Sequence, residues 1–333
     1  MKRILLIATG GTIASVEGET GLEPRIGAER LLSFVPEVAP LCAIDTLSPI
    51  NLDSTQIQPE HWVLLAGLIR EQYDRYDGFV ICHGTDTMAY TAAALSYLVQ
   101  GSPKPIVLTG SQYPIDAANT DGRMNLADAL TYACAPGSQD VSLCFGGRVI
   151  AGTRARKTRT KSFDAFASID FPELAKIRRG RILRYLPPRT LTGPVFYDRI
   201  NPRVMLIKLI PGMPGGILED LADRFDALVI ESFGVGGLPS GGRSDFLERM
   251  ARLHEAGKVV VMATQVMHEG SDLGVYRVGR LVAERYHLIE SGDMTLEATV
   301  TKLMWLLGRG LEGEDLRRAF AAPVNYDTLD ILE

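Results

Sequence analysis

The sequence lacks the residue patterns that mark several common classes of protein. Its four cysteines are widely spaced, without the close pairs typical of zinc or redox sites, so we expect reduced cysteines packed in apolar surroundings. The five histidines show no His-Glu-x-x-His or similar spacing. The sequence therefore predicts neither a metal nor another cofactor. The cysteines are Cys42, Cys82, Cys134 and Cys144.

Long apolar runs and a basic charge balance are missing as well. No run approaches the roughly 20 residues that span a bilayer, and the run Ile4–Ala8 is too short for the core of a signal peptide. These absences favour a cytoplasmic protein without membrane partners. A formal net charge of -5 is not that of a nucleic-acid-binding protein, which would carry a basic surface.

What is present is an alternation of short apolar runs with amphipathic segments. The run Phe79–Cys82 is followed by a helical pattern, and Pro59 opens another that carries Trp62, Leu65 and Ile69 on one stripe. This alternation predicts an α/β protein whose larger N-terminal domain has a mostly parallel sheet with flanking helices. The other N-terminal runs are Ile4–Ala8, Pro105–Leu108 and Val141–Phe145.

The chain is long enough for two cores, because single cores stop growing near roughly 250 to 300 residues. Prolines cluster and periodicity lapses between 187 and 203. We therefore predict an N-terminal α/β domain at 1–186, a linker at 187–203 and a smaller C-terminal α/β domain at 204–333. The C-terminal runs are Val204–Leu209, Ala227–Ile230 and Val259–Met262, with a closing helix at Met294–Leu307.

Two threonine-bearing motifs follow predicted strands directly. Thr9-Gly10-Gly11-Thr12 comes after the first run, and His83-Gly84-Thr85-Asp86-Thr87 comes after Phe79–Cys82. The ends of parallel strands are where α/β folds place ligand sites, and paired glycines let a backbone approach a ligand closely. A plain glycine turn and a helix cap at Asp86 and Thr87 are the alternative interpretations of these motifs. The occurrence of both motifs favours a shared site.

Two further segments have simple structural explanations when taken alone. Lys157 lies in a basic run that is typical of a solvated surface, and nothing in that run distinguishes it. Asp53 and Ser54 precede Pro59 and fit a turn or a helix cap.

Taken together, the motifs resemble the L-asparaginase family, in particular its bacterial cytoplasmic type I enzymes, over nearly the whole chain. The matching pieces are Ala8–Ile13, Leu52–Ser54, Tyr76–Ile81, His83–Thr91, Thr109–Gln112, Asp121-Gly122, Phe163–Ser168, Gly292–Thr295 and Glu297–Thr299. The resemblance implies hydrolysis of L-asparagine to L-aspartate and ammonia through a threonine acyl-enzyme, without a cofactor. It also implies a homodimer or homotetramer.

The resemblance assigns the site residues as well. Thr12 matches the first catalytic threonine of the family and Thr85 the second, with Asp86 and Lys157 accompanying Thr85. The residues that the resemblance assigns to substrate binding are Asp53, Ser54, Thr85, Asp86 and Ser111.

The chemistry fits this assignment. A hydroxyl nucleophile divides the hydrolysis of an unreactive amide into two easier steps. A desolvated lysine can accept the proton that a threonine or a water gives up. We expect backbone N–H groups of the two glycine-bearing turns to stabilise the oxyanion, each contributing on the order of 3 kcal/mol. Asp53 or Asp86 would bind the ammonium of the substrate, and Ser54 its carboxylate.

Three positions depart from the family pattern. The family usually carries a Gly-Tyr pair on the loop after the first threonine, where the tyrosine helps activate the nucleophile, but this sequence has Gly21-Leu22. A leucine cannot relay a proton. Gly237 stands where asparagine is common, and Glu231 where some type I enzymes have arginine near an effector site. Allosteric control by asparagine is therefore not predicted.

The sequence leaves three alternatives open. One methylene in a pocket is worth only roughly 1 to 3 kcal/mol, so the sequence does not separate asparagine from glutamine as substrate. An amidase subunit of a tRNA-dependent amidotransferase shares the motifs, although we expect such a subunit to carry an added N-terminal domain. The third alternative is a catalytically silent amino-acid-binding protein, which only Leu22 motivates.

Overall fold

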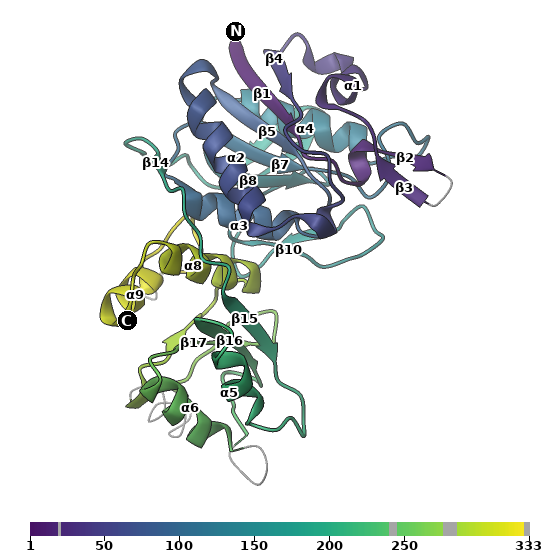
Figure 1. Ribbon diagram of the computed structural model, residues 1–333. Coiled ribbons are helices and arrows are strands. Elements are labelled where there is room, and N and C mark those ends of the chain that lie inside the picture. The colour runs from purple at the N-terminus through teal and green to yellow at the C-terminus, as the bar shows by residue number, and fades with distance from the viewer. Residues whose placement is uncertain (19–20, 240–244, 276–284, 330–333) are drawn as a thin grey trace. The chain divides into compact units, whose positions relative to one another are not determined.

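The computed structural model describes residues 1–18, 21–239, 245–275 and 285–329, and the chain divides into two compact units (Figure 1). The first unit comprises Met1–Asp198 together with Val324–Tyr326, and the second comprises Arg199–Pro323 with Asp327–Glu333. Within the described residues, no helix is both long and apolar enough to cross a membrane.

The first unit is built on an eight-stranded sheet. Its strands β8, β7, β5, β1 and β4 are parallel neighbours, and antiparallel strands complete the other side. This confirms the predicted mostly parallel sheet. In spatial order the strands are β13 (Arg181–Arg184), β12 (Ala175–Arg178), β9 (Arg148–Ala151), β8 (Asp140–Phe145), β7 (Pro105–Thr109), β5 (Gly78–Cys82), β1 (Lys2–Ala8) and β4 (Cys42–Leu47).

Helices cover both faces of this sheet (Figure 1). Alternate residues of β1, such as Ile4 and Leu6, share a core with α1 and α4, because successive strand side chains point to opposite faces. On the other face α2 packs against α3, and α3 packs against β7 and β8. Burial on both faces explains why β5 and β7 are continuous apolar runs. The helices are α1 (Ala28–Ser33), α2 (Pro59–Gln72), α3 (Met88–Leu98) and α4 (Gly122–Cys134).

The helix predicted from Pro59 is confirmed as α2. Proline occupies its first turn, where the missing N–H costs no hydrogen bond, and the predicted stripe of Trp62, Leu65 and Ile69 is buried. Among the residues that the structure describes, three short strand pairs lie outside the two larger sheets. They are β2 (Ser15–Gly18) with β3 (Gly21–Pro24), β6 (Val99–Gln100) with β14 (Val195–Phe196), and β10 (Ala155–Lys157) with β11 (Phe166–Ser168).

The second unit is a smaller α/β domain, as predicted. Its parallel sheet has the order β15-β16-β17-β18, and its core joins this sheet to α5 and α6. The three predicted runs form β15, β16 and β17, and the predicted closing helix forms α8. The elements are β15 (Val204–Lys208), α5 (Ile217–Ala222), β16 (Ala227–Ser232), α6 (Phe246–Glu255), β17 (Val259–Thr264), β18 (Ile289–Glu290), α8 (Leu296–Gly308) and α9 (Gly313–Ala321).

Candidate active site

The predicted motifs meet at one edge of the large sheet. The neighbouring strands β4, β1, β5 and β7 all end there, because they run parallel. Backbone hydrogen bonds join the segments that follow them: Thr9 N–H donates to the Cys82 carbonyl at 3.0 Å, and His83 N–H donates to the Thr109 carbonyl at 2.8 Å. Leu52 N–H donates to the Thr9 carbonyl at 2.9 Å, which brings in the segment of Asp53 and Ser54.

Two glycines bring the threonine motifs into direct contact. A Cβ added to Gly11 would lie 2.3 Å from the Cα of Gly84, and Gly11 has a φ of +76°. A Cβ added to Gly84 would lie 2.6 Å from the Oγ of Ser54. Only glycine allows backbones to approach so closely. Thr12 and Thr85 each follow one of the two touching glycines, so the fold places both threonine motifs and Ser54 in one site.

Thr12 begins a short 3-10 turn and is half-buried, whereas the next two residues, Ile13 and Ala14, are fully buried. The hydroxyl of Ser15 donates to the Gly11 carbonyl at 2.9 Å and so fixes the turn from its other side. The N–H of Gly11 donates to the Leu52 carbonyl at 2.8 Å. This amide therefore joins the Thr12 loop to the Leu52 segment, and the other N–H groups of the two glycine-bearing turns stay the predicted donors to the oxyanion.

Lys157 connects the second threonine motif to a separate hairpin. It ends β10, paired with Phe166 of β11, and its side chain is 16% exposed. Its Nζ donates to the Thr85 Oγ1 at 2.7 Å and to the Asp86 Oδ1 at 2.6 Å. The fold thus distinguishes Lys157 from the rest of its basic run, and it brings Thr85, Asp86 and Lys157 together.

The capping interpretation of Asp86 and Thr87 is not what the structure contains. Thr87 is the N-cap of α3 but makes no side-chain capping bond there; its hydroxyl donates to the Ser54 carbonyl at 2.8 Å. The carboxylate of Asp86 faces Lys157. At Asp53, by contrast, capping does occur, because its Oδ1 accepts from the backbone N–H of Thr55 at 2.8 Å. Asp53 itself is exposed.

Ser111 lies in the turn after β7 and is fully buried, with its hydroxyl donating to the Tyr113 carbonyl. The side chain that reaches Thr85 from this turn is Gln112, whose Oε1 accepts from the Thr85 Oγ1 at 3.3 Å. The carboxylate of Asp121 holds the turn by accepting from the N–H of Gln112 at 3.0 Å. The sequence motif contained Gln112, but no property of the sequence alone indicated this contact.

His83 supports the turn at Gly84 from the interior of the protein. It is fully buried, and burial lowers the pKa of its imidazole to about 4, so the ring is neutral at pH 7. Its Nδ1 lies 2.7 Å from the Gly84 carbonyl and its Nε2 lies 3.0 Å from the Thr91 hydroxyl. A neutral ring that donates from Nδ1 accepts at Nε2, which satisfies both contacts. The imidazole therefore fixes the orientation of the Gly84 carbonyl.

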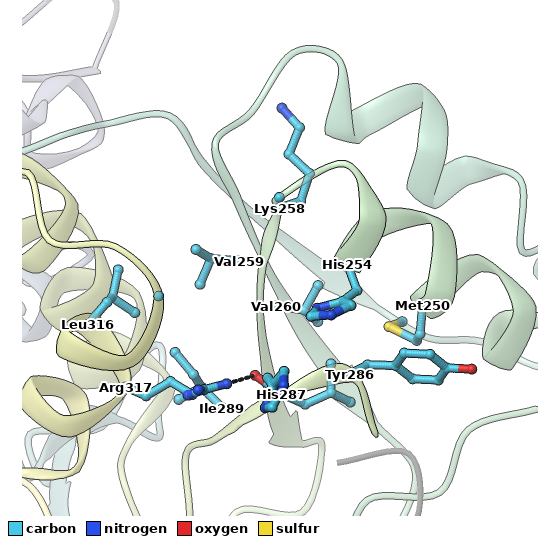
Figure 2. Close-up of a pocket in the computed structure, with 13 residues that line it drawn as sticks. Met250, His254, Lys258, Val259, Val260, Tyr286, His287, Ile289, Leu316 and Arg317 are labelled. Carbon is cyan, nitrogen blue, oxygen red and sulfur yellow. Dashed lines mark hydrogen bonds between the residues drawn. The ribbon is translucent and has the colours of Figure 1, made fainter. Parts of the chain in front are cut away.

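Leu22 lies in β3, which packs against the turn that begins at Thr12, and it pairs with Glu17 of β2. A cavity of about 220 Å³ lies in the second unit, between α6, β17 and α9 (Figure 2). There the rings of His254 and His287 are 5.4 Å apart, and Arg317 donates to the His287 carbonyl at 3.4 Å. No predicted site residue lines this cavity. Among the described residues, no group of three or more histidines, cysteines or acids is arranged to hold a metal.

The chain is similar to known proteins over nearly its whole length. Residues 3–189 match the family model described as asparaginase, N-terminal, and residues 203–320 match the glutaminase/asparaginase C-terminal domain. The L-asparaginase of Thermococcus kodakarensis is 40% identical over 318 residues, which are 95% of this chain and 96% of that protein. L-asparaginase 1 of Escherichia coli K12 is 37% identical, covering 96% of both chains.

One subunit of the glutamyl-tRNA(Gln) amidotransferase of Metallosphaera sedula is also similar, at 33% identity over 95% of this chain and 74% of that protein. Among solved structures, the thermostable L-asparaginase of Thermococcus kodakarensis superimposes with a TM-score of 0.92 at 38% identity, covering 99% of this chain and 100% of that one.

Proposed function

This chain belongs to the asparaginase family, and from that premise we propose that it hydrolyses L-asparagine to L-aspartate and ammonia through an ester intermediate on Thr12. The observation that carries the proposal is the contact of Gly11 with Gly84, which joins the Thr12 loop to the group of Thr85, Asp86 and Lys157.

In the first step the Oγ1 of Thr12 adds to the side-chain carbonyl carbon of asparagine. The carbon–nitrogen bond then breaks, the nitrogen leaves as ammonia, and an aspartyl ester on Thr12 remains. In the second step water attacks the ester carbonyl, which releases aspartate and restores the hydroxyl of Thr12. Both steps need a group that removes a proton from an oxygen nucleophile.

We assign that proton transfer to Thr85 with Lys157 and Asp86. The Nζ of Lys157 lies within 2.7 Å of the Thr85 hydroxyl, and Asp86 balances its charge at 2.6 Å. With leucine at position 22, where the family pattern has tyrosine, this group takes part in acylation as well as in deacylation. The hydrogen bond of Thr85 to Gln112 orients the hydroxyl for either step.

We assign the substrate-binding residues from the charge and exposure of their side chains. Asp86 is 58% exposed and Asp53 is exposed, so both carboxylates are accessible to the ammonium of an amino acid. Ser54 is 4% exposed and lies against Gly84, beside the threonine motif, which supports its hydroxyl as the group that binds the α-carboxylate. The hydroxyl of Ser111 is already bonded to Tyr113, so we assign to Ser111 the support of the substrate-binding turn.

The decisive experiment measures ammonia release from asparagine. We expect Thr12→Ala to lower kcat about a thousandfold or more with the fold intact, and Thr12→Ser to keep part of the activity. Thr192→Ala, at an exposed threonine outside the site, is the matched control and should leave kcat unchanged. In Thr85→Ala we expect both steps to slow and deacylation to slow more, so the aspartyl ester on Thr12 should accumulate and be visible by mass spectrometry. Full activity in Thr12→Ala would refute the nucleophile assignment.

The same assay separates the alternative functions. Turnover of glutamine with a kcat/KM similar to that for asparagine would make the chain a glutaminase-asparaginase. Ammonia release only in the presence of a second amidotransferase subunit and charged tRNA would support the amidotransferase alternative. Binding of asparagine without turnover would identify a silent amino-acid-binding protein.

We also propose that the chain acts as a homodimer or homotetramer, as the family resemblance implies, and that it lies in the cytoplasm, which the likeness to a solved probable cytoplasmic L-asparaginase of Campylobacter jejuni supports. Light scattering after size exclusion should give two or four times the chain mass, and cell fractionation should recover the protein with the cytosol. A monomer with full activity, or recovery outside the cytosol, would refute the respective part.

A further inference from the structure

Two cysteines that lie far apart in the sequence meet in the fold. Cys42 begins β4 and Cys134 ends α4, and their thiols are in hydrogen-bond contact. Both belong to the layer between α4 and the sheet, and neither is in a disulfide. Their spacing in the chain gave no sign of this pair. Neither residue belongs to the candidate active site.

Lys2 adds a positive charge to the pair. It is the residue of β1 that pairs with Cys42, and its Nζ donates to the carbonyl of Ala135, next to Cys134, at 3.1 Å. The hydrogen bond from Cys134 and the ammonium of Lys2 lower the pKa of Cys42, against the effect of burial. The same contact raises the pKa of Cys134. Cys42 is thus the thiol of the pair that loses its proton more readily.

The other two cysteines lack these features. Cys82 and Cys144 are fully buried, and burial alone raises the pKa of Cys82 to about 12. For Cys144 burial also raises the thiol pKa, and the nearby Asp128 raises it further. Buried thiols of this kind are inert, because the thiolate is the reactive species.

A path to Cys42 exists for small molecules. The side chain is only 3% exposed, but it lines a surface pocket of about 210 Å³ formed with residues of α1 and of the turn after it. These neighbours are apolar, so they admit a small uncharged reagent more readily than a charged one. They include Leu32, Val35, Val38, Ala39 and Ile44.

We propose that Cys42 and Cys134 are an oxidation site for small hydroperoxides, with Cys42 as the reacting thiol and Cys134 as the resolving thiol. The Cys42 thiolate attacks the outer oxygen of the hydroperoxide, which forms a sulfenic acid and releases an alcohol, or water from hydrogen peroxide. The Cys134 thiol then attacks the sulfenic sulfur, which forms the disulfide and releases water. The sum is two thiols and one hydroperoxide giving one disulfide, one alcohol and one water.

The test uses the full chain treated with hydrogen peroxide and mapped by mass spectrometry without reduction. We expect a Cys42–Cys134 disulfide that a dithiol reverses, while Cys82 and Cys144 remain free. This measurement needs no substitution, so it does not depend on how a variant folds. Four free thiols after treatment, or a disulfide between any other pair, would overturn the proposal.

Variants then test the order of the two steps. In Cys134→Ser we expect dimedone to trap a sulfenic acid on Cys42, and in Cys42→Ser no sulfenic acid on Cys134 under the same exposure. Adding Lys2→Met to Cys134→Ser should slow the trapping several-fold, because the thiolate fraction of Cys42 falls. Cys82→Ala is the control and should form the disulfide as the unmodified chain does. Dimedone labelling on Cys134 in preference to Cys42 would contradict the assignment of the reacting thiol.

Discussion

At the scale of single residues, the contacts of Lys157 favour a catalytic role for its side chain over a structural one. Its partner Asp86 is 58% exposed, and ion pairs open to solvent contribute only about 0 to 1 kcal/mol to stability. The pair is therefore not needed to hold the fold. The Nζ of Lys157 contacts the Thr85 hydroxyl at 2.7 Å, and this geometry supports a role in proton transfer.

This distinction gives a prediction for Lys157→Met, which keeps an unbranched side chain one heavy atom shorter and removes its charge. We expect kcat for asparagine to fall by about 10² to 10⁴, because a positioned acid–base group contributes that much, while the free energy of unfolding changes by less than about 1 kcal/mol. Lys161→Met, at an exposed lysine of the same run, should change neither. Steady-state kinetics and urea unfolding measure the two quantities. An unchanged kcat in Lys157→Met would exclude the proton-transfer role.

At the scale of elements, the close contact between two loops is the most sensitive part of the site. In Gly84→Ala the added methyl would lie 2.6 Å from the Cβ of Ser54 and 3.0 Å from the Cα of Gly11, so the loops must separate. We expect kcat/KM to fall about 10²-fold, because a displacement of about 1 Å between reacting groups costs that much. Thermal unfolding should occur at a lower temperature.

The matched control is Gly67→Ala in α2, where an added Cβ meets nothing within 4 Å. Alanine there should stabilise the chain by about 0.5 to 1 kcal/mol and leave the kinetics unchanged. If Gly84→Ala kept full activity, the contact of Gly11 with Gly84 would not be what assembles the site.

The elements that could be predicted from the sequence are those in which one physical pattern dominates. The run of β5 is buried throughout, and α2 carries a proline start and one apolar stripe. The sequence of the β10–β11 hairpin shows no such pattern, because each strand has three residues and Lys157 lies within a charged run. The resemblance to a family therefore located Lys157, and periodicity did not. For the same reason the two-residue strand β18 carried no readable signal.

At the scale of the whole molecule, the two α/β units were predictable from the lapse of periodicity, and we propose that 187–203 acts as the linker between 1–186 and 204–333. The return of Val324–Tyr326 to the first unit was not predictable. Neither was the contact of Cys42 with Cys134. Both depend on tertiary packing between segments far apart in the chain, and the residues involved show no pattern of their own.

The returning segment leads to a prediction about stability. Asn325 is 6% exposed, and its Nδ2 donates to the Ser96 Oγ at 3.0 Å and to the Val141 carbonyl at 2.9 Å. It also has a φ of +46°, a conformation that asparagine tolerates better than most residues. Asn325→Leu removes both of these buried hydrogen bonds and adds backbone strain, while Ser96 still donates to the Ala92 carbonyl and Val141 still accepts from the Gly152 N–H.

We expect Asn325→Leu to lower the free energy of unfolding by about 2 to 4 kcal/mol, because each lost hydrogen bond contributes about 0.5 to 1.5 kcal/mol and an unfavourable backbone conformation costs about 1 to 3 kcal/mol. Leu329→Ala, at a nearby side chain that is 46% exposed, should have little effect. Urea unfolding measures the free energy of unfolding of both variants and so tests this prediction, with kcat measured under native conditions. Equal stability of the two variants would mean that the first unit does not need the returning segment, and a stable fragment ending at Asp198 should then exist.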